Sequence, residues 1–125
     1  MSIIPLSDQA YYDGEFCYPV DKILELTKDI KPVKVDVSVL YEKINHPVKK
    51  VFGSIKKMYE FIEHVDRIMN ADLKYPIIAF SEDNDICDGC HRIAKAKIIG
   101  RSKLNVIYIN KDMIKHLKVD PSIYE

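Results

Sequence analysis

The chain has 125 residues, of which 47% are hydrophobic, and its 19 basic residues balance its 19 acidic residues. This length suits one domain over residues 1–125, the apolar content excludes wholesale disorder, and the zero net charge argues against binding long nucleic acids through an overall positive field. No segment approaches the roughly 20 apolar residues of a membrane helix, and the N-terminus lacks a signal-peptide pattern. We therefore expect a cytoplasmic protein with no membrane partner.

The N-terminal third predicts short elements. Met1 to Pro19 contains scattered aromatic residues, glycine and proline, which is typical of an irregular or edge-pairing segment. Asp21 to Thr27 has the pattern of a short helix. From Val33 to Ser38 valines alternate with polar residues, which predicts a half-buried strand, and Leu40 to Ile44 favours one or two helical turns.

A longer helix is predicted in the middle of the chain, from an N-cap at Ser54 to about Met69. Apolar residues recur there at steps of three and four, which places them on one face. This stripe consists of Ile55, Met58, Tyr59, Ile62 and Val65. We expect the stripe to pack into the core.

The C-terminal half predicts a strand, hairpin, helix and strand in succession. Ile77–Phe80 is a continuous apolar run typical of a buried strand, and Ile86-Cys87 reads as the returning strand of a hairpin. Alanine and lysine favour a helix over Ile93–Ile99, which Gly100 ends, and Leu104–Ile109 predicts another buried strand.

Asn110 is the predicted N-cap of a last helix over residues 111–118. The alternation of strands and helices indicates an α/β (α+β) fold, in which a small mixed sheet is flanked by helices. The chain shows no internal repeat and no linker that divides it into domains.

One segment, Asp88-Gly89-Cys90-His91-Arg92, has the residues of an anion site. The first turn of a helix presents backbone N–H groups and a positive dipole end, and glycine lets the backbone approach a ligand. An arginine can hold phosphate oxygens with two donors, a histidine can shuttle a proton, and an aspartate can hold a magnesium ion. The alternative is a helix cap in which the arginine pairs with a surface carboxylate.

The stretch from Tyr75 to Gly100 (YPIIAFSEDNDICDGCHRIAKAKIIG) resembles the core of the ParB/sulfiredoxin superfamily. In that core a strand with a Pro-Ile start is followed by a turn, a glycine before His-Arg or Arg-Arg, a helix with small residues, and a glycine. The likeness is clearest over residues 75–110, and the N-terminal half matches only in outline, through Val20–Ile23. The resemblance implies a ParB/sulfiredoxin-like fold whose phosphate-binding residues include Gly89, Cys90, His91 and Arg92.

The resemblance implies several activities. ParB-type partition proteins bind and hydrolyse CTP and clamp DNA, sulfiredoxins use a cysteine with ATP to repair peroxiredoxins, and archaeal free-serine kinases phosphorylate a metabolite. Our first hypothesis is an Mg²⁺-dependent NTP hydrolase or phosphotransferase that uses ATP or CTP. Its acceptor is water or a small molecule, its metal ligand is Asp88, and its catalytic residues are Asp88, His91, Arg92 and, if redox chemistry applies, Cys90.

The second hypothesis is a sulfiredoxin-like redox enzyme, because Cys90 stands where sulfiredoxins have their cysteine. A thiolate at a helix N-terminus has a lowered pKa and is a competent nucleophile. Against this, Asp88 replaces a glycine of the sulfiredoxin motif, and Cys90 can instead be a small filler. Cys87 is predicted to be a core residue, and the lone CxxC does not complete a zinc site.

The third hypothesis is a nucleotide-sensing or DNA-associated module without catalysis. The zero net charge and the lack of a helix-turn-helix make DNA the less favoured partner. By the same resemblance, Arg67 and Asp72 are candidate nucleotide contacts, with a surface ion pair as the alternative. Asp21 and Asp36 are weak candidates for a general base, and His64 is expected to be a surface or partly buried histidine.

Overall fold

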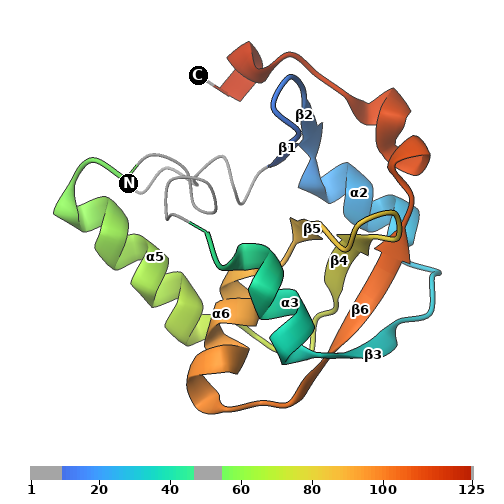
Figure 1. The fold of residues 1–125 in the computed structure, drawn as a ribbon. Helices are drawn as coiled ribbons and strands as arrows, with labels where there is room; N and C mark the ends of the chain where they lie inside the picture. The colour runs from blue at the N-terminus through green and yellow to red at the C-terminus, as the bar shows by residue number, and fades with distance from the viewer. Residues whose placement is uncertain (1–9, 47–54, 125) are drawn as a thin grey trace.

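A four-stranded mixed sheet with strand order β3-β6-β4-β5 forms the centre of the computed structural model, which describes residues 10–46 and 55–124 (Figure 1). Strand β4 (Ile77–Phe80) runs parallel to β6 (Lys103–Ile109) and antiparallel to β5 (Ile86–Asp88). Strand β3 (Val33–Asp36) pairs antiparallel with β6 at the other edge. The predicted fold class, a small mixed sheet flanked by helices, is confirmed.

The burial of the strands follows their positions in this sheet. All four residues of β4 are buried, as expected for an interior strand covered on both faces. The edge strand β3 is much more open, and Val33 is 51% exposed. The alternating pattern therefore predicted this strand, but its predicted end at Ser38 is wrong: the strand ends at Asp36, because a helix begins at Val37. Its first valine does not enter the core.

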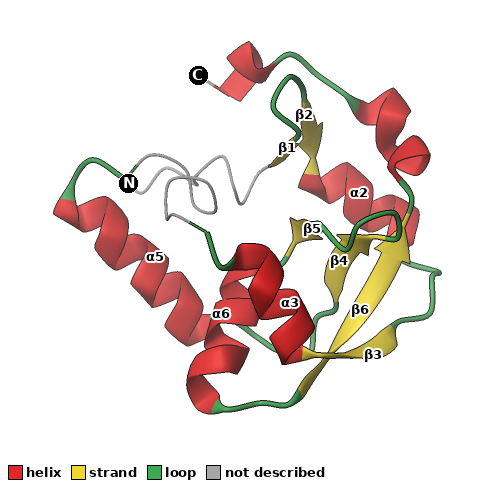
Figure 2. Ribbon diagram, in the orientation of Figure 1, coloured by secondary structure: helices red, strands yellow, loops and turns green. Residues whose placement is uncertain are grey.

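Helices cover both faces of the sheet (Figure 2). On one face, α3 (Val37–Ile44) and α6 (Cys90–Ile99) pack on the apolar side chains of β4 and β6. On the other face lies α2 (Val20–Thr27), whose Ile23 joins a second buried cluster. The crossover from β4 through the β5 hairpin and α6 to the parallel strand β6 needs a helix on the sheet face, which α6 supplies.

The two ends of the described chain pack together. A hairpin of β1 (Ala10–Tyr12) and β2 (Cys17–Pro19) exchanges backbone hydrogen bonds with Val119, near the C-terminus. The predicted last helix exists as a 3₁₀ helix, η1 (Lys111–Leu117), and the Asn110 side chain accepts from the N–H of Met113 as an N-cap should. A short 3₁₀ helix, η2 (Pro121–Tyr124), follows.

The middle helix, α5 (Met58–Asn70), differs from its prediction. It begins at Met58, and the proposed cap Ser54 lies outside the described residues. The expectation that its apolar stripe packs into the core is wrong: Met58, Tyr59, Ile62 and Val65 are all exposed, and the buried residue of this helix is His64. The helix contacts α6 through its polar side, so three-to-four spacing identified a face but not the direction of that face.

No helix in the described parts of the chain is long and apolar enough to cross a membrane.

Candidate functional site

Gly89 joins β5 to α6 in a conformation that suits glycine. Its φ is +116°, in the left-handed region, and it is the N-cap residue of α6. A Cβ at this position would lie 2.5 Å from Cδ1 of the buried Ile77, which leaves no space for one. The backbone at Gly89 therefore lies directly on β4, and the first turn of α6 is fixed against the sheet.

The first turn of α6 begins directly after Gly89. Its first intrahelical hydrogen bond runs from the N–H of Ile93 to the carbonyl of Gly89 at 3.0 Å. A ten-residue helix presents the positive end of its dipole at this first turn. Anions are stabilised at such a position.

Arg92 is held in place by two contacts. Its Nη1 donates to the carbonyl oxygen of Pro76 at 2.9 Å, and its Nη2 donates to Oδ2 of Asp88 at 2.8 Å. The two charged side chains are only 16% and 19% exposed, so their hydrogen bonds are shielded from water. Arg92 thus ties α6 to the start of β4 and to the end of β5, and it places its guanidinium beneath the first turn of the helix.

His91 has a histidine partner on the neighbouring helix. Its Nε2 lies 2.9 Å from Nδ1 of His64, which is 5% exposed. The ring planes are 14° from parallel, and the ring centroids are 5.2 Å apart. Because the nitrogens are far closer than the centroids, the rings meet edge to edge through a hydrogen bond, with one nitrogen protonated and the other accepting.

The side of α5 that is at least partly covered is mainly polar, with Ile68 as its apolar member. Besides His64 it includes Glu60, Glu63 and Arg67, spaced three and four residues apart as one helical face requires. A lysine of α6 also reaches this helix, since Nζ of Lys95 donates to the carbonyl of Ala71 at 2.7 Å. The structure therefore brings Arg67, a predicted nucleotide contact, to the same helix face as the partner of His91.

The cysteines of the CxxC lie in different surroundings. Cys90 is the first residue of α6 and is partly exposed, whereas Cys87 is buried in β5, as predicted. Burial, followed by the charge of Asp88, raises the pKa of the Cys87 thiol, so it stays protonated. Only Cys90 of this pair has a position from which it can react with a dissolved partner.

Other candidate residues are not drawn into this cluster. Among the described residues, Asp72 makes its polar contacts with Lys74, through the backbone N–H and an ion pair at 3.5 Å. Asp36 ends the edge strand β3 and pairs with Lys103 at 3.4 Å, two strands away from β4. Asp21 is in the first turn of α2, which packs on the opposite sheet face from α6.

The predicted magnesium ligand is already engaged by a cation. Oδ2 of Asp88 accepts from Arg92, and residues 10–46 and 55–124 contain no group of three His, Cys, Asp or Glu side chains that could hold a metal ion. The Asp88 carboxylate is therefore part of an ion pair with Arg92.

A scan against protein-family models, a search of curated proteins and a search of solved structures each found no match for this chain. The class of the protein is therefore defined by its own structure. It is a small α+β protein in which a glycine, an arginine–aspartate pair and a histidine pair converge on the first turn of α6.

Sequence reasoning missed the part played by His64. The histidine lies on the helix of the apolar stripe, and that stripe was assumed to face inward. The available signal was the second series on the same helix, in which Glu60, His64 and Arg67 also recur at helical spacing. A polar series at helical spacing marks a second face of the helix that can meet a neighbouring element.

Proposed function

We propose that this protein binds the phosphate groups of a nucleoside triphosphate at the N-terminus of α6 and catalyses transfer of the terminal phosphate to water or to a small hydroxyl-bearing molecule. The observation that supports this proposal most directly is the position of Gly89. It packs against Ile77 with no space for a Cβ and directly precedes the first turn of α6. Backbone N–H groups at the positive end of a helix suit a phosphate.

The neighbouring side chains supply what phosphoryl transfer requires, which is mainly positioning and charge stabilisation. Arg92 is fixed by Asp88 and Pro76, so its positive charge is pre-organised near the first turn. His91 shares a hydrogen bond with His64, which holds its ring in place. On this proposal Arg92 stabilises the transferring phosphate, and His91 handles the proton of the acceptor hydroxyl or water.

The order of elements supports the ParB/sulfiredoxin resemblance as part of this proposal. Strand β4, the β5 hairpin, the glycine, α6, its terminal Gly100 and the parallel strand β6 follow one another as that core requires. The nucleotide is taken to be ATP or CTP, and magnesium enters as the metal complex of that nucleotide.

The test is phosphorus NMR of the whole chain with ATP, CTP, GTP or ADP in the presence of Mg²⁺, with and without a pool of small hydroxyl compounds. Wild type is compared with Arg92→Ala, His91→Gln and a control, Lys97→Ala, which removes an exposed charge from the last turn of α6. We expect loss of the terminal phosphate signal in wild type and in the control, with a rate about 100-fold lower for Arg92→Ala.

Because Arg92 also joins α6 to β4, each variant is first checked for an unchanged circular dichroism spectrum and thermal transition. His91→Gln serves as the second variant, since it leaves the contacts of Arg92 in place. Two outcomes contradict the proposal. In the first, the nucleotide spectra of wild type do not change. In the second, His91→Gln and Arg92→Ala are both folded and both turn over at the wild-type rate. Tight nucleotide binding without turnover points instead to a nucleotide-sensing module.

A second function, the sulfiredoxin-like repair of an oxidised cysteine, is favoured by one observation. Cys90 is partly exposed at the first position of α6, where the helix dipole stabilises a thiolate. Cys90→Ser separates the two functions. The redox function predicts complete loss of activity, whereas the phosphotransfer function predicts a small change, because the backbone of residue 90 does the binding.

A further inference from the structure

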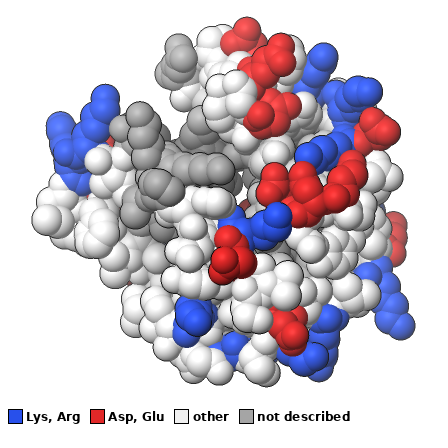
Figure 3. Space-filling model, viewed as in Figure 1, with Lys and Arg blue, Asp and Glu red and all other residues white. Residues whose placement is uncertain are grey.

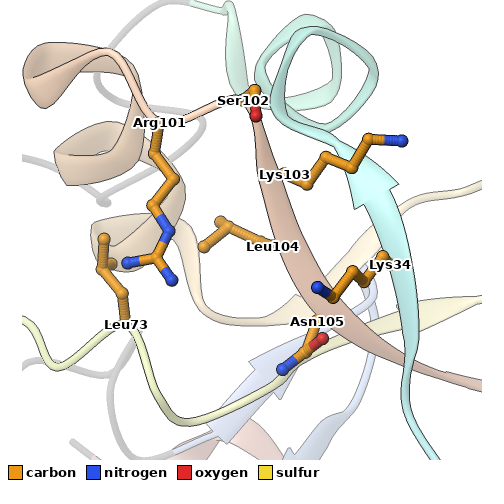
Figure 4. Close-up of a pocket in the computed structure, with 7 residues that line it drawn as sticks. All are labelled: Lys34, Leu73, Arg101, Ser102, Lys103, Leu104 and Asn105. Atoms are coloured by element: carbon orange, nitrogen blue, oxygen red, sulfur yellow. The ribbon is translucent and has the colours of Figure 1, made fainter.

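A second polar hollow lies at the other end of α6, where the chain turns from that helix into β6 (Figure 4). Its volume is about 300 Å³, at the lower end of the range for small-molecule sites. The lining residues come from β3, from the loop before β4, and from the turn and strand that follow α6. They are Lys34, Leu73, Arg101, Ser102, Lys103, Leu104 and Asn105.

The charged residues that line this hollow are all basic. Its lining contains three basic residues and no acidic residue, although the whole chain has zero net charge. Two aspartates next to lining residues each form an ion pair with a lysine: Asp36 with Lys103 at 3.4 Å, and Asp72 with Lys74 at 3.5 Å. Within the described parts of the chain, Lys34 and Arg101 have no acidic partner at ion-pair distance, so their charges are available to a ligand.

The two cations approach the hollow from different elements. Lys34 is paired across β3 and β6 with Asn105, so the two side chains lie next to each other on one sheet face. Figure 4 shows the guanidinium of Arg101 opposite this pair, beside Leu73, while the ammonium group of Lys103 points away from the hollow. In the space-filling view, basic side chains lie at several separate places along the lower part of the molecule, with acidic side chains among them (Figure 3).

Backbone hydrogen bonds hold the turn that contains Arg101. Gly100 has a φ of +76°, and the N–H of Arg101 donates to the carbonyl of Ala96 at 2.9 Å, which closes the helix end. The carbonyl of Ser102 then accepts from the N–H of Val37 at 2.9 Å. These bonds occupy a carbonyl at the negative end of the helix and fix the backbone on both sides of Arg101.

We propose that this hollow is a binding site for a small phosphomonoester. Arg101 can hold two phosphate oxygens with its planar fork, and Lys34 can neutralise the remaining charge from the opposite side. The Asn105 amide and the Ser102 hydroxyl supply uncharged donors. Leu73 and the buried Leu104 give an apolar wall for the organic part of the ligand.

This site is separate from the proposed catalytic one. Residues 88–92 lie at the N-terminal end of α6, whereas Arg101 follows its C-terminal end, and a helix of ten residues is about 15 Å long. A result that contradicts one of the two proposed sites therefore does not contradict the other. A phosphomonoester at the second site can be an acceptor, a product or an effector, and a binding experiment tests its presence there whichever of these it is.

The experiment is an amide-correlation NMR titration of the full chain with phenyl phosphate, inorganic phosphate and a short single-stranded oligonucleotide. Wild type is compared with Arg101→Ala, Arg101→Lys, Lys34→Ala and the control Lys22→Ala, which removes an exposed charge from α2. We expect saturable shifts of residues 101–105 and of the Asn105 side-chain amide with phenyl phosphate, and weaker binding of inorganic phosphate. We expect Arg101→Ala and Lys34→Ala to weaken binding about tenfold, Arg101→Lys to weaken it less, and Lys22→Ala to leave it unchanged.

Several outcomes overturn the proposal. Equal affinity of wild type and a folded Arg101→Ala shows that the guanidinium holds no ligand. Shifts confined to residues 88–92 place the phosphate at the other site, which supports the proposed function but not this one. Tighter binding of the oligonucleotide than of phenyl phosphate, with the same shifts, assigns the hollow to a nucleic-acid backbone instead.

Discussion

The rings of His64 and His91 share a hydrogen bond of 2.9 Å that joins α5 to α6. The two residues are 27 positions apart in the sequence, and the bond places the buried side chain of one against the motif residue of the other. Since a hydrogen bond between two imidazoles needs one donor and one acceptor, the tautomers of the two rings depend on each other. The orientation of the motif histidine is therefore set by a helix outside the motif.

Replacing His64 tests this relationship through stability. We expect His64→Ala to lower the free energy of unfolding by about 1–3 kcal/mol, because it leaves a cavity between the helices and removes the partner of His91. Urea denaturation followed by circular dichroism measures the change. The matched control is His116→Ala in η1, an exposed histidine whose removal should change stability by less than about 0.5 kcal/mol. Equal effects of the two substitutions contradict the importance of the histidine pair.

Gly89 can be tested against a glycine that has the same kind of backbone but open space. Gly14 has a φ of +102°, and a Cβ there would meet no described atom within 4 Å, whereas a Cβ on Gly89 would meet Ile77 at 2.5 Å. We expect Gly89→Ala to destabilise the protein by about 1–3 kcal/mol more than Gly14→Ala, since both place an alanine at a positive φ and only one creates a clash. Thermal and urea unfolding measure both variants.

The same clash suggests a rescue. Ile77→Val removes Cδ1, the atom that a Cβ on Gly89 would meet. In the Gly89→Ala background this second substitution should therefore cost less stability than it costs alone. A double-mutant cycle measures the coupling, and strict additivity of the two substitutions shows that the close approach does not matter.

The thiols of Cys87 and Cys90 should differ in reactivity. Burial raises the pKa of Cys87 and keeps water and reagents away from its sulfur, whereas Cys90 is partly exposed at the start of α6. We expect iodoacetamide at neutral pH to modify Cys90 well before Cys87, and Cys87 to react only when the protein unfolds. Peptide mass spectrometry over time distinguishes the two sites, with alkylation in denaturant as the control. Simultaneous modification in the folded protein contradicts the assignment.

Asp13 gives a prediction on pH. Partial burial opposes ionisation of its carboxyl, but hydrogen bonds from the Phe16 N–H, the Tyr18 hydroxyl and the Glu15 N–H together lower its pKa. A carboxyl whose pKa is lower in the folded state stabilises the fold above its unfolded pKa of about 3.9, and this contribution disappears as the pH falls through the folded value. We expect Asp13→Asn to be less stable than wild type near pH 6, with the difference shrinking toward pH 3.

The same carboxylate acts on Tyr18 in the opposite direction. Burial, together with the hydrogen bond to Asp13 and its negative charge, raises the pKa of Tyr18 to about 12. Removing that charge in Asp13→Asn should bring the ionisation of this tyrosine closer to the ordinary value of about 10. Absorbance titration of tyrosinate measures this change, with Asp120→Asn as a control at an exposed aspartate. An unchanged titration curve contradicts the assigned contact.

Most of the local structure follows from the sequence alone. The apolar run of β4, the hairpin to β5, the helix that ends at Gly100 and the cap at Asn110 are all confirmed, because each depends on neighbouring residues and on backbone preferences. The glycine before Cys90 was identified from the motif, and its φ of +116° is a backbone conformation that glycine adopts without steric cost.

Tertiary structure alone decided which of these residues meet. The apolar stripe of α5 is exposed because the helix turns its polar side toward α6, and periodicity carries no information about which neighbour a face will meet. The same holds for Arg92, which contacts Pro76 and Asp88 because β4 and β5 pair in one register. It also holds for Lys34, which lies in the same hollow as Arg101 because β3 pairs with β6. The sequence determined the elements and the motif, while packing between separate elements determined the contacts on which both proposed sites depend.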